Sequence, residues 1–309
     1  MDEREALIES IHDKDLISYF YLDIPASKVL ERMDGLTLTL LECCDEIPFN
    51  AQVKGYIAAR DSDGDPWIVK PIHSGGEVLY HRICTLAFLL DNWMGTFAAP
   101  TTVFSIGGMY YRATKVVRNS VNIGSYNYLD SPFIDIIRAD LINRWLYFDE
   151  DRNPNNYLVI HNSQNKPFIV AIDYDKADLQ SERMKITGTK ERFGWLRSEK
   201  TRFLTLLKPE NFDGVPLETF SQRLTSMMSI TEDELTALVS GLLSGYLPKP
   251  EATVSLLVKN ICERRAYIDT YFRSWFKPKA ETKSVMNEAD YMLFGKSFID
   301  IYQGKKNGQ

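Results

Sequence analysis

The character of the chain changes near residue 119, and this change limits the folds open to it more than any other feature. Before this point, alternating and β-branched stretches predict short strands around a single helix. After it, apolar residues recur mostly at helical spacing. A β-rich part followed by a helical part is typical of the α+β class. We therefore predict an α+β protein with two lobes, a small one over residues 36–118 and a larger, mostly helical one over residues 119–276.

The small lobe is predicted to hold one helix between two groups of strands. The helix spans residues 77–94, with its apolar residues on one face and glycines before and after it. The strands are recognised by alternation and by the turn residues between them, and they span residues 36–41, 53–60, 67–72, 101–106 and 110–117. This order of elements predicts a compact β-rich unit.

The larger lobe is predicted to combine helices with one hairpin. Helices are expected over residues 133–148, over residues 235–243 behind a capping box that starts at Thr231, and over residues 253–276. The hairpin is predicted over residues 157–172, from two apolar strands joined by turn residues.

The length and composition fit a folded protein of this size. The 309 residues correspond to about two domains or two lobes. Outside the lobes, residues 1–35 are expected to form an N-terminal helical extension, and residues 277–309 a lysine-rich C-terminal tail. Hydrophobic residues make up 44% and charged residues 25%, as in globular proteins. The net charge of -6 gives no strong nucleic-acid signal and argues against a protein that mainly coats anionic lipid.

The cysteines and the first residues point to a reducing compartment. The four cysteines, Cys43, Cys44, Cys84 and Cys262, lack C-x-x-C spacing, so neither a disulfide framework nor a structural zinc site is expected. The first ten residues are acidic and lack the apolar stretch of a secretory signal. Apolar runs end far short of the ~20 residues that a membrane span needs. We expect a cytoplasmic protein without a transmembrane segment.

A set of oxygen ligands lies between residues 149 and 175. Asp151 is followed five residues later by Asn156, and Asp173 ends the next predicted strand. Such oxygens suit Mg²⁺, which also binds substrate phosphates. Kinases combine these ligands with a lysine on the nucleotide phosphates. Lys70 is the candidate lysine, because it lies near the end of an otherwise apolar strand.

Two further carboxylates leave alternatives open. Asp149 could take the place of Asp151, and Asp175 could replace or assist Asp173. The stretch 149–156 is also ordinary turn chemistry, since Asn and Asp side chains bond their own backbone. The second carboxylate group and the upstream strand lysine together favour a phosphotransferase site over a plain loop.

The central motif resembles a known family. The run Asp151-Arg152-x-x-x-Asn156-Tyr157-Leu158-Val159, followed by Ala171-Ile172-Asp173, is similar to the D-R-H-x-x-N catalytic loop and I-D metal strand that HipA-like kinases share with phosphoinositide-kinase-like enzymes. Residues 67–70 resemble the strand with the phosphate-contacting lysine, and residues 262–268 the arginine-pair helix of HipA-like domains. The resemblance, over about residues 36–276, implies a two-lobed protein-kinase-like fold. It also implies ATP and Mg²⁺ as cofactors and a serine/threonine hydroxyl on a protein, including this chain itself, as acceptor.

The resemblance assigns roles to individual residues. It implies that Asp151 orients or deprotonates the acceptor hydroxyl and that Asn156 and Asp173 bind the metal. It implies that Lys70 contacts the phosphates with the support of Glu77. The segment that would form the hinge against adenine contains Lys115, Val116 and Val117.

Some features depart from the family pattern. Asn153 occupies the position of the loop histidine, residues 43–52 contain no glycine for a phosphate cradle, and Gly75-Gly76 follows Lys70 rather than preceding it. Two other functions therefore stay open. One is a kinase of a lipid head group or small molecule, and the other is a nucleotide-binding pseudokinase or interaction module.

Structural roles also stay open for residues around the predicted site. Lys70 can be a strand-edge lysine that extends to water, and Glu77 can be an acid favoured by the N-terminus of a helix. His73 and His81 are candidate acid–base groups, for which a structural role is the simpler interpretation.

Overall fold

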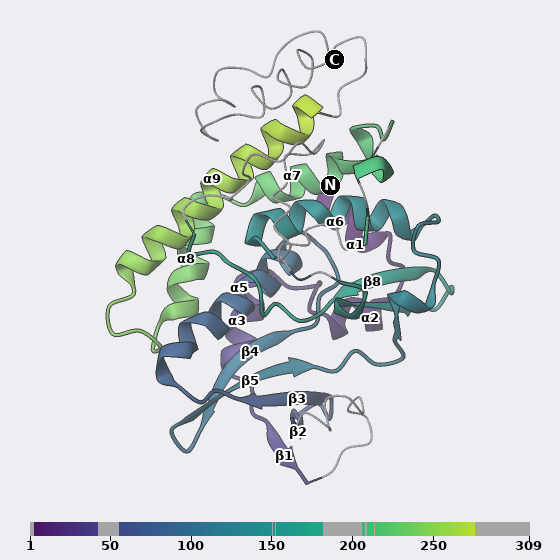
Figure 1. Ribbon diagram of the computed structural model, residues 1–309. Helices are drawn as coiled ribbons and strands as arrows, with labels where there is room; N and C mark the ends of the chain where they lie inside the picture. The colour runs from purple at the N-terminus through teal and green to yellow at the C-terminus, as the bar shows by residue number, and fades with distance from the viewer. Residues whose placement is uncertain are drawn as a thin grey trace.

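The computed structural model describes residues 3–42, 56–149, 151, 153–181, 206–207, 209–212 and 214–275 (Figure 1). The glycine-free stretch 43–52, Arg152 of the motif and the predicted tail 277–309 lie outside the described residues. Among the described residues, no helix has both the length and the apolar character needed to cross a membrane.

Three short helices form the start of the described chain: α1 (Glu3–Glu9), α2 (Lys14–Tyr19) and α3 (Ala26–Asp34). Asp13 caps α2, because its carboxylate accepts a hydrogen bond from the Leu16 N–H at 3.0 Å. The apolar face of α3 is buried. This face packs against α5 and α8, so the N-terminal helices belong to the body of the protein.

A five-stranded antiparallel sheet follows, in the order β1-β2-β3-β5-β4. Its strands are β1 (Thr39–Leu41), β2 (Ile57–Arg60), β3 (Pro66–Pro71), β4 (Thr101–Ile106) and β5 (Met109–Lys115). Helix α5 (Val78–Trp93) connects β3 with β4 and packs against β4. Since successive strand residues point to opposite faces, Trp67, Val69 and Ala113 enter the core while Lys70 and Arg112 lie on the other face.

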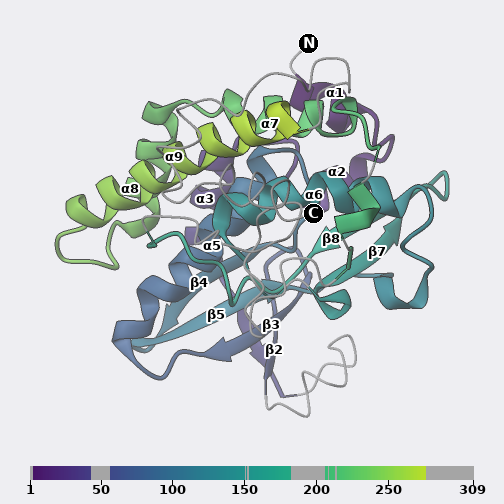
Figure 2. The ribbon, with the colours of Figure 1, turned by 45° about the horizontal axis from the view of Figure 1, so that its top comes forward.

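The described residues after β5 form a smaller sheet and four longer helices. The sheet has the order β6-β7-β8, from β6 (Val121–Asn122), β7 (Tyr157–His161) and β8 (Pro167–Ala171). The helices are α6 (Phe133–Tyr147), α7 (Glu218–Ser229), α8 (Glu232–Leu243) and α9 (Glu251–Trp275). Helices α7, α8 and α9 lie on the side of the helical layer away from the five-stranded sheet (Figures 1 and 2).

Main-chain hydrogen bonds join the two parts at the strand that leads to the site. The Ala99 N–H donates to the Ala171 carbonyl at 2.9 Å, and the Ala171 N–H donates to the Phe97 carbonyl at 3.0 Å. They place the end of β8 beside the segment that enters β4. One large apolar core extends through both parts.

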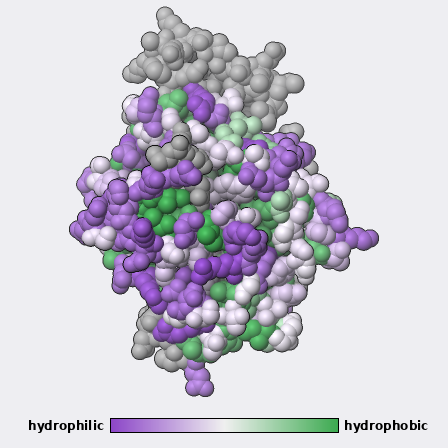
Figure 3. Space-filling model, turned by 180° about the vertical axis from the view of Figure 1, so that it is seen from behind, coloured by the Kyte–Doolittle hydropathy of each residue, from purple (hydrophilic) through white to green (hydrophobic). Residues whose placement is uncertain are grey.

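The two-lobed α+β class expected from the sequence is confirmed, with an antiparallel sheet in the N-terminal part and helices in the C-terminal part. The capping box at Thr231 is present, with Glu234 as its second member. The surface is mostly hydrophilic with small apolar areas between polar ones, as the face opposite to that of Figure 1 shows (Figure 3).

Candidate active site

Lys70 reaches from the small lobe to the segment that follows β8. Its Nζ lies 3.6 Å from Oδ2 of Asp175, and the two side chains are 35% and 29% exposed. The lysine side chain is thus partly exposed. The structure therefore brings the predicted phosphate-contacting lysine to the predicted metal segment.

Arg112 is a second cation at the same place. It stands directly opposite Lys70 in the β3–β5 register, so both side chains emerge from the same face of the sheet. Its guanidinium makes an ion pair with Asp175, and Nη2 lies 3.9 Å from Oδ1 of Asp173. Like charges directly opposite each other repel, and the shared carboxylate offsets this repulsion.

Helix α5 holds the segment that carries these carboxylates. The Tyr80 hydroxyl donates to the Asp175 carbonyl, and the Cys84 thiol lies 3.3 Å from the Tyr174 carbonyl as a weak donor. The Tyr174 hydroxyl donates to Oδ2 of the buried Asp91 at 2.6 Å. Asp173 has a φ of 57°, which is unfavourable for a side chain with a Cβ. The contacts of α5 with the next two residues stabilise this conformation.

The loop before β7 is organised around Asp151. The Asp151 N–H donates to Oδ1 of Asp149 at 2.9 Å, and the Asn156 amide donates to the Asp151 carbonyl. The Ile172 N–H donates to the Asn156 carbonyl at 3.1 Å. Asn156 thus lies beside both Asp151 and the residue that precedes Asp173. These hydrogen bonds bring the predicted acceptor-orienting and metal-binding residues together.

The two carboxylates of this loop differ in access. Asp151 is exposed, whereas Asp149 is 1% exposed and stabilises the loop by accepting the hydrogen bond from the Asp151 N–H. Asn153, which stands where the family pattern has histidine, donates from Nδ2 to Oδ1 of Asp151 at 3.0 Å. Its Oδ1 accepts from the Asn155 N–H at 2.8 Å. A fixed amide therefore orients the exposed carboxylate.

The oxygen atoms of the site suit a metal ion whose ligands come partly from the protein and partly from a substrate. Among the described residues, no three His, Cys, Asp or Glu side chains gather to hold a metal by themselves. Mg²⁺ needs only one or two carboxylates when phosphate oxygens complete its shell. Asp173, Asp175 and the Asn156 amide offer oxygens of this kind on adjoining segments.

An apolar row lies next to the cations on the same face of the sheet. The β-strand register places Leu41, Ala58 and Ile68 side by side, and they form a small cluster with Tyr56 apart from the main core. Lys70 Nζ lies 5.8 Å from the Tyr56 ring centroid. A small apolar cluster therefore lies beside Lys70 on the face of the sheet that also carries Arg112.

Glu77 does not reach Lys70 in the described structure. It is exposed at the N-terminal end of α5, and the ion pair described for Lys70 is with Asp175. Support of Lys70 by Glu77 stays a prediction. Asp175 was not predicted as a partner of Lys70, because the two residues lie far apart along the chain.

Lys115 of the predicted hinge is directed into the protein. It is 3% exposed, and its Nζ lies 2.6 Å from Oδ2 of Asp65. The ring centroids of Tyr19 and Tyr21 lie 4.0 and 4.8 Å from the ammonium. Burial lowers the pKa of Lys115, and the hydrogen bond and charge of Asp65 oppose this shift. The side chain therefore holds the lobe together rather than facing a ligand.

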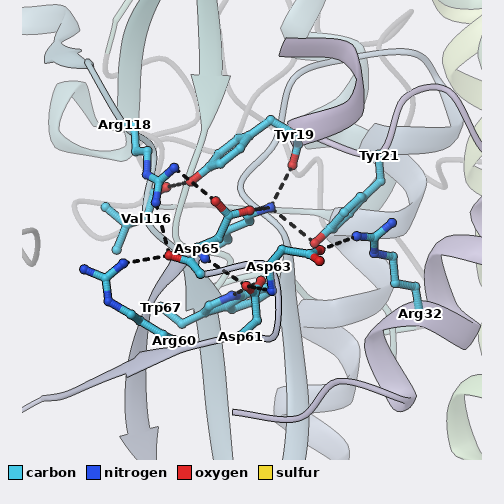
Figure 4. Close-up of polar contacts among 12 residues, drawn as sticks. Tyr19, Tyr21, Arg32, Arg60, Asp61, Asp63, Asp65, Trp67, Val116 and Arg118 are labelled. Atoms are coloured by element: carbon cyan, nitrogen blue, oxygen red, sulfur yellow. Dashed lines mark hydrogen bonds and ion pairs between the residues drawn. The ribbon is translucent and has the colours of Figure 1, made fainter. Parts of the chain in front are cut away.

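The neighbouring hinge residues are also engaged within the protein. The Val116 N–H donates to the Pro66 carbonyl at 2.9 Å, and its carbonyl accepts from the Tyr19 hydroxyl (Figure 4). Val117 is buried in a second apolar cluster with Phe20. Contact of this segment with adenine stays a prediction, and in the structure Pro66 of β3 and Tyr19 of α2 contact it.

Comparisons with known proteins give only remote similarities. No protein-family model matches the chain, and no curated protein matches it. Among solved structures, the chain is similar to the proinflammatory kinase CtkA of Helicobacter pylori, with 11% identity and a TM-score of 0.41 over 71% of this chain and 93% of that one. It is also similar to the choline kinase LicA of Streptococcus pneumoniae, with 12% identity and a TM-score of 0.24 over 89% and 96% of the two chains.

Proposed function

We propose that the chain is an ATP- and Mg²⁺-dependent phosphotransferase. The observation that carries this proposal is the meeting of Lys70 with Asp175, since it joins the cationic face of the small lobe to the carboxylates after β8. The loop that holds Asp151 and Asn156 borders the same segment. Phosphoryl transfer depends mainly on positioning and on neutralising phosphate charge, which these groups supply.

Each group has one task in this proposal. Asp173, with Asn156 and Asp175, holds Mg²⁺, which neutralises phosphate charge when bound. Lys70 binds the phosphates. Asp151, exposed and oriented by Asn153, accepts the proton of the attacking hydroxyl.

The acceptor that we propose is a serine or threonine hydroxyl on a protein, as in the HipA-like kinases that the loop resembles, and autophosphorylation belongs to the same activity. The accessible Asp151 carboxylate supports an acceptor that approaches from solvent. A small alcohol or a lipid head group carries the same hydroxyl chemistry, so acceptors of each kind form separate arms of the test.

The test is ADP formation from Mg-ATP by the wild type, with a general protein substrate, a small alcohol or anionic vesicles as acceptor. Asp151→Asn and Asp173→Asn should lower the rate by about 10²-fold or more. Asp135→Asn, an exposed change on α6, is the matched control and should keep the wild-type rate. No turnover with any acceptor, together with Mg-ATP-dependent thermal stabilisation that Asp173→Asn abolishes, would identify a nucleotide-binding pseudokinase instead.

A further inference from the structure

Arg112 is placed as a ligand-binding residue would be. Its side chain is only 11% exposed, yet it lies on the face of β5 that points away from the core residues Tyr111 and Ala113. It reaches the same carboxylate as Lys70. The two cations therefore meet at one carboxylate on this face of the sheet.

The positive side chains at this place are paired with carboxylates, and a bound metal ion and anion can replace these ion pairs. Lys70 and Arg112 face Asp173 and Asp175, so two positive side chains are matched by two negative ones. Asp175 lies close to both cations, and Asp173 Oδ1 is 3.9 Å from Nη2 of Arg112. If the carboxylates bind a divalent cation, both positive side chains become available for an anion at the same place.

His81 on α5 is buried and interacts electrostatically with Lys70 and Arg112. It is 6% exposed, and among the described residues its Nδ1 has no hydrogen-bond partner. Burial, and then the positive charges of Arg112 and Lys70, lower the pKa of His81 to about 4. The imidazole is therefore neutral near pH 7 and adds no third positive charge to those of Lys70 and Arg112.

We propose that Arg112 is a second phosphate-binding residue, which binds the polyphosphate chain of a nucleoside triphosphate together with Lys70. This inference rests on the proposed function. The planar guanidinium binds phosphate with two parallel N–H donors, whereas the lysine ammonium acts as a point charge. Asp175 is the counter-ion of Arg112 until the nucleotide binds.

Isothermal titration calorimetry tests the inference on the full chain. Wild type, Arg112→Met and Arg112→Lys are titrated with Mg-ATP, with adenosine and with inorganic tripolyphosphate plus Mg²⁺. Arg112→Met should weaken Mg-ATP and tripolyphosphate binding by about tenfold or more, while adenosine binding stays unchanged. Arg112→Lys keeps the charge but loses the fork, so its affinity for both phosphates should lie between the other two.

A matched control comes from Arg273, which is exposed and makes an ion pair with Asp269 on α9, away from the cluster. Arg273→Met should bind all three probes as the wild type does. Circular dichroism of each variant checks folding, and if Arg112→Met does not fold, the comparison of Arg112→Lys with the wild type decides.

The outcomes separate the two proposals. Unchanged Mg-ATP and tripolyphosphate affinity in the Arg112 variants, in a wild type that forms ADP, overturns the role of Arg112 and leaves the proposed function standing. Weakened phosphate binding in these variants, in a wild type that transfers no phosphate, supports the role of Arg112 while the proposed transfer fails. A wild type that binds neither Mg-ATP nor tripolyphosphate overturns both.

Discussion

Lys70 and Arg112 stand directly opposite each other on β3 and β5, and both make ion pairs with Asp175. The carboxylate thus holds two like charges together on one face of the sheet. This relationship gives the segment after β8 a structural role as well as the proposed role in metal binding.

Removal of the shared carboxylate should destabilise the protein. Asp175→Asn leaves Lys70 and Arg112 to repel each other, and we expect a loss of about 1 kcal/mol in the free energy of unfolding, since the groups are partly exposed. Urea denaturation measures this loss. Adding Arg112→Met should restore part of it, and a double-mutant cycle should give a coupling energy on the order of 1 kcal/mol. Strictly additive effects would show that the pair makes no net contribution.

The stability of the protein should fall in mild acid because of His81. Its pKa is about 4 in the folded protein and 6.5 in the unfolded chain, so the unfolded chain takes up a proton first as the pH falls. The stability that neutral His81 contributes is present above pH 6.5 and is lost as the pH falls toward 4, by at most about 3 kcal/mol.

The check is a urea denaturation series over this pH range for wild type and His81→Gln. The other ionisable groups are common to both proteins, so the difference between the two curves isolates the histidine. The wild type should lose more stability than the variant on acidification. Parallel curves would contradict a neutral, buried His81.

Much of the fold could be predicted from the sequence, because strand alternation and helical spacing are local patterns. The predicted strand 101–106 and helix 133–148 correspond to β4 and α6. The loop from Asp151 to Asn156 could also be found, since its spacing is fixed within one short segment. These features need no knowledge of which segments meet in space.

The missed residues depend on contacts between distant segments. No local sequence pattern marks Arg112 as a site residue. Its position opposite Lys70 follows from the β3–β5 register. Choosing Asp175 rather than Glu77 as the lysine's partner required the position of β8 against the small lobe. Lys115 was predicted to contact the nucleotide, but the N-terminal helices, whose position the sequence did not indicate, enclose its side chain.

Lys115 should be important for stability. Lys115→Met removes a buried partner of Asp65, which keeps Arg118 at 3.1 Å, and we expect a loss of about 2 kcal/mol in the free energy of unfolding. Thermal denaturation followed by circular dichroism measures the effect. Lys28→Met, which removes an exposed ion pair on α3, is the control and should change stability by less than about 0.5 kcal/mol. Equal stability of both variants would show that the enclosed lysine is dispensable.

Tyr174 should influence Mg²⁺ binding through its neighbours. Tyr174→Phe loses the hydrogen bond to Asp91, at a cost of about 1 kcal/mol, and loosens the residue between Asp173 and Asp175. The Mg²⁺ concentration needed for half-maximal ATP binding should rise several-fold. Tyr147→Phe removes the other tyrosine hydroxyl from Asp91 but lies outside this segment. It should lose similar stability and keep the wild-type Mg²⁺ dependence, so an equal shift in both variants would contradict a positioning role.

The most direct test of the account is the intact mass of the chain, and of a general protein acceptor, after incubation with Mg-ATP. For the wild type, the account predicts added phosphoryl groups on serine or threonine of either protein, and it predicts none for Asp151→Asn or Asp173→Asn. Unchanged masses with the wild type, or equal phosphorylation by all three proteins, would contradict it.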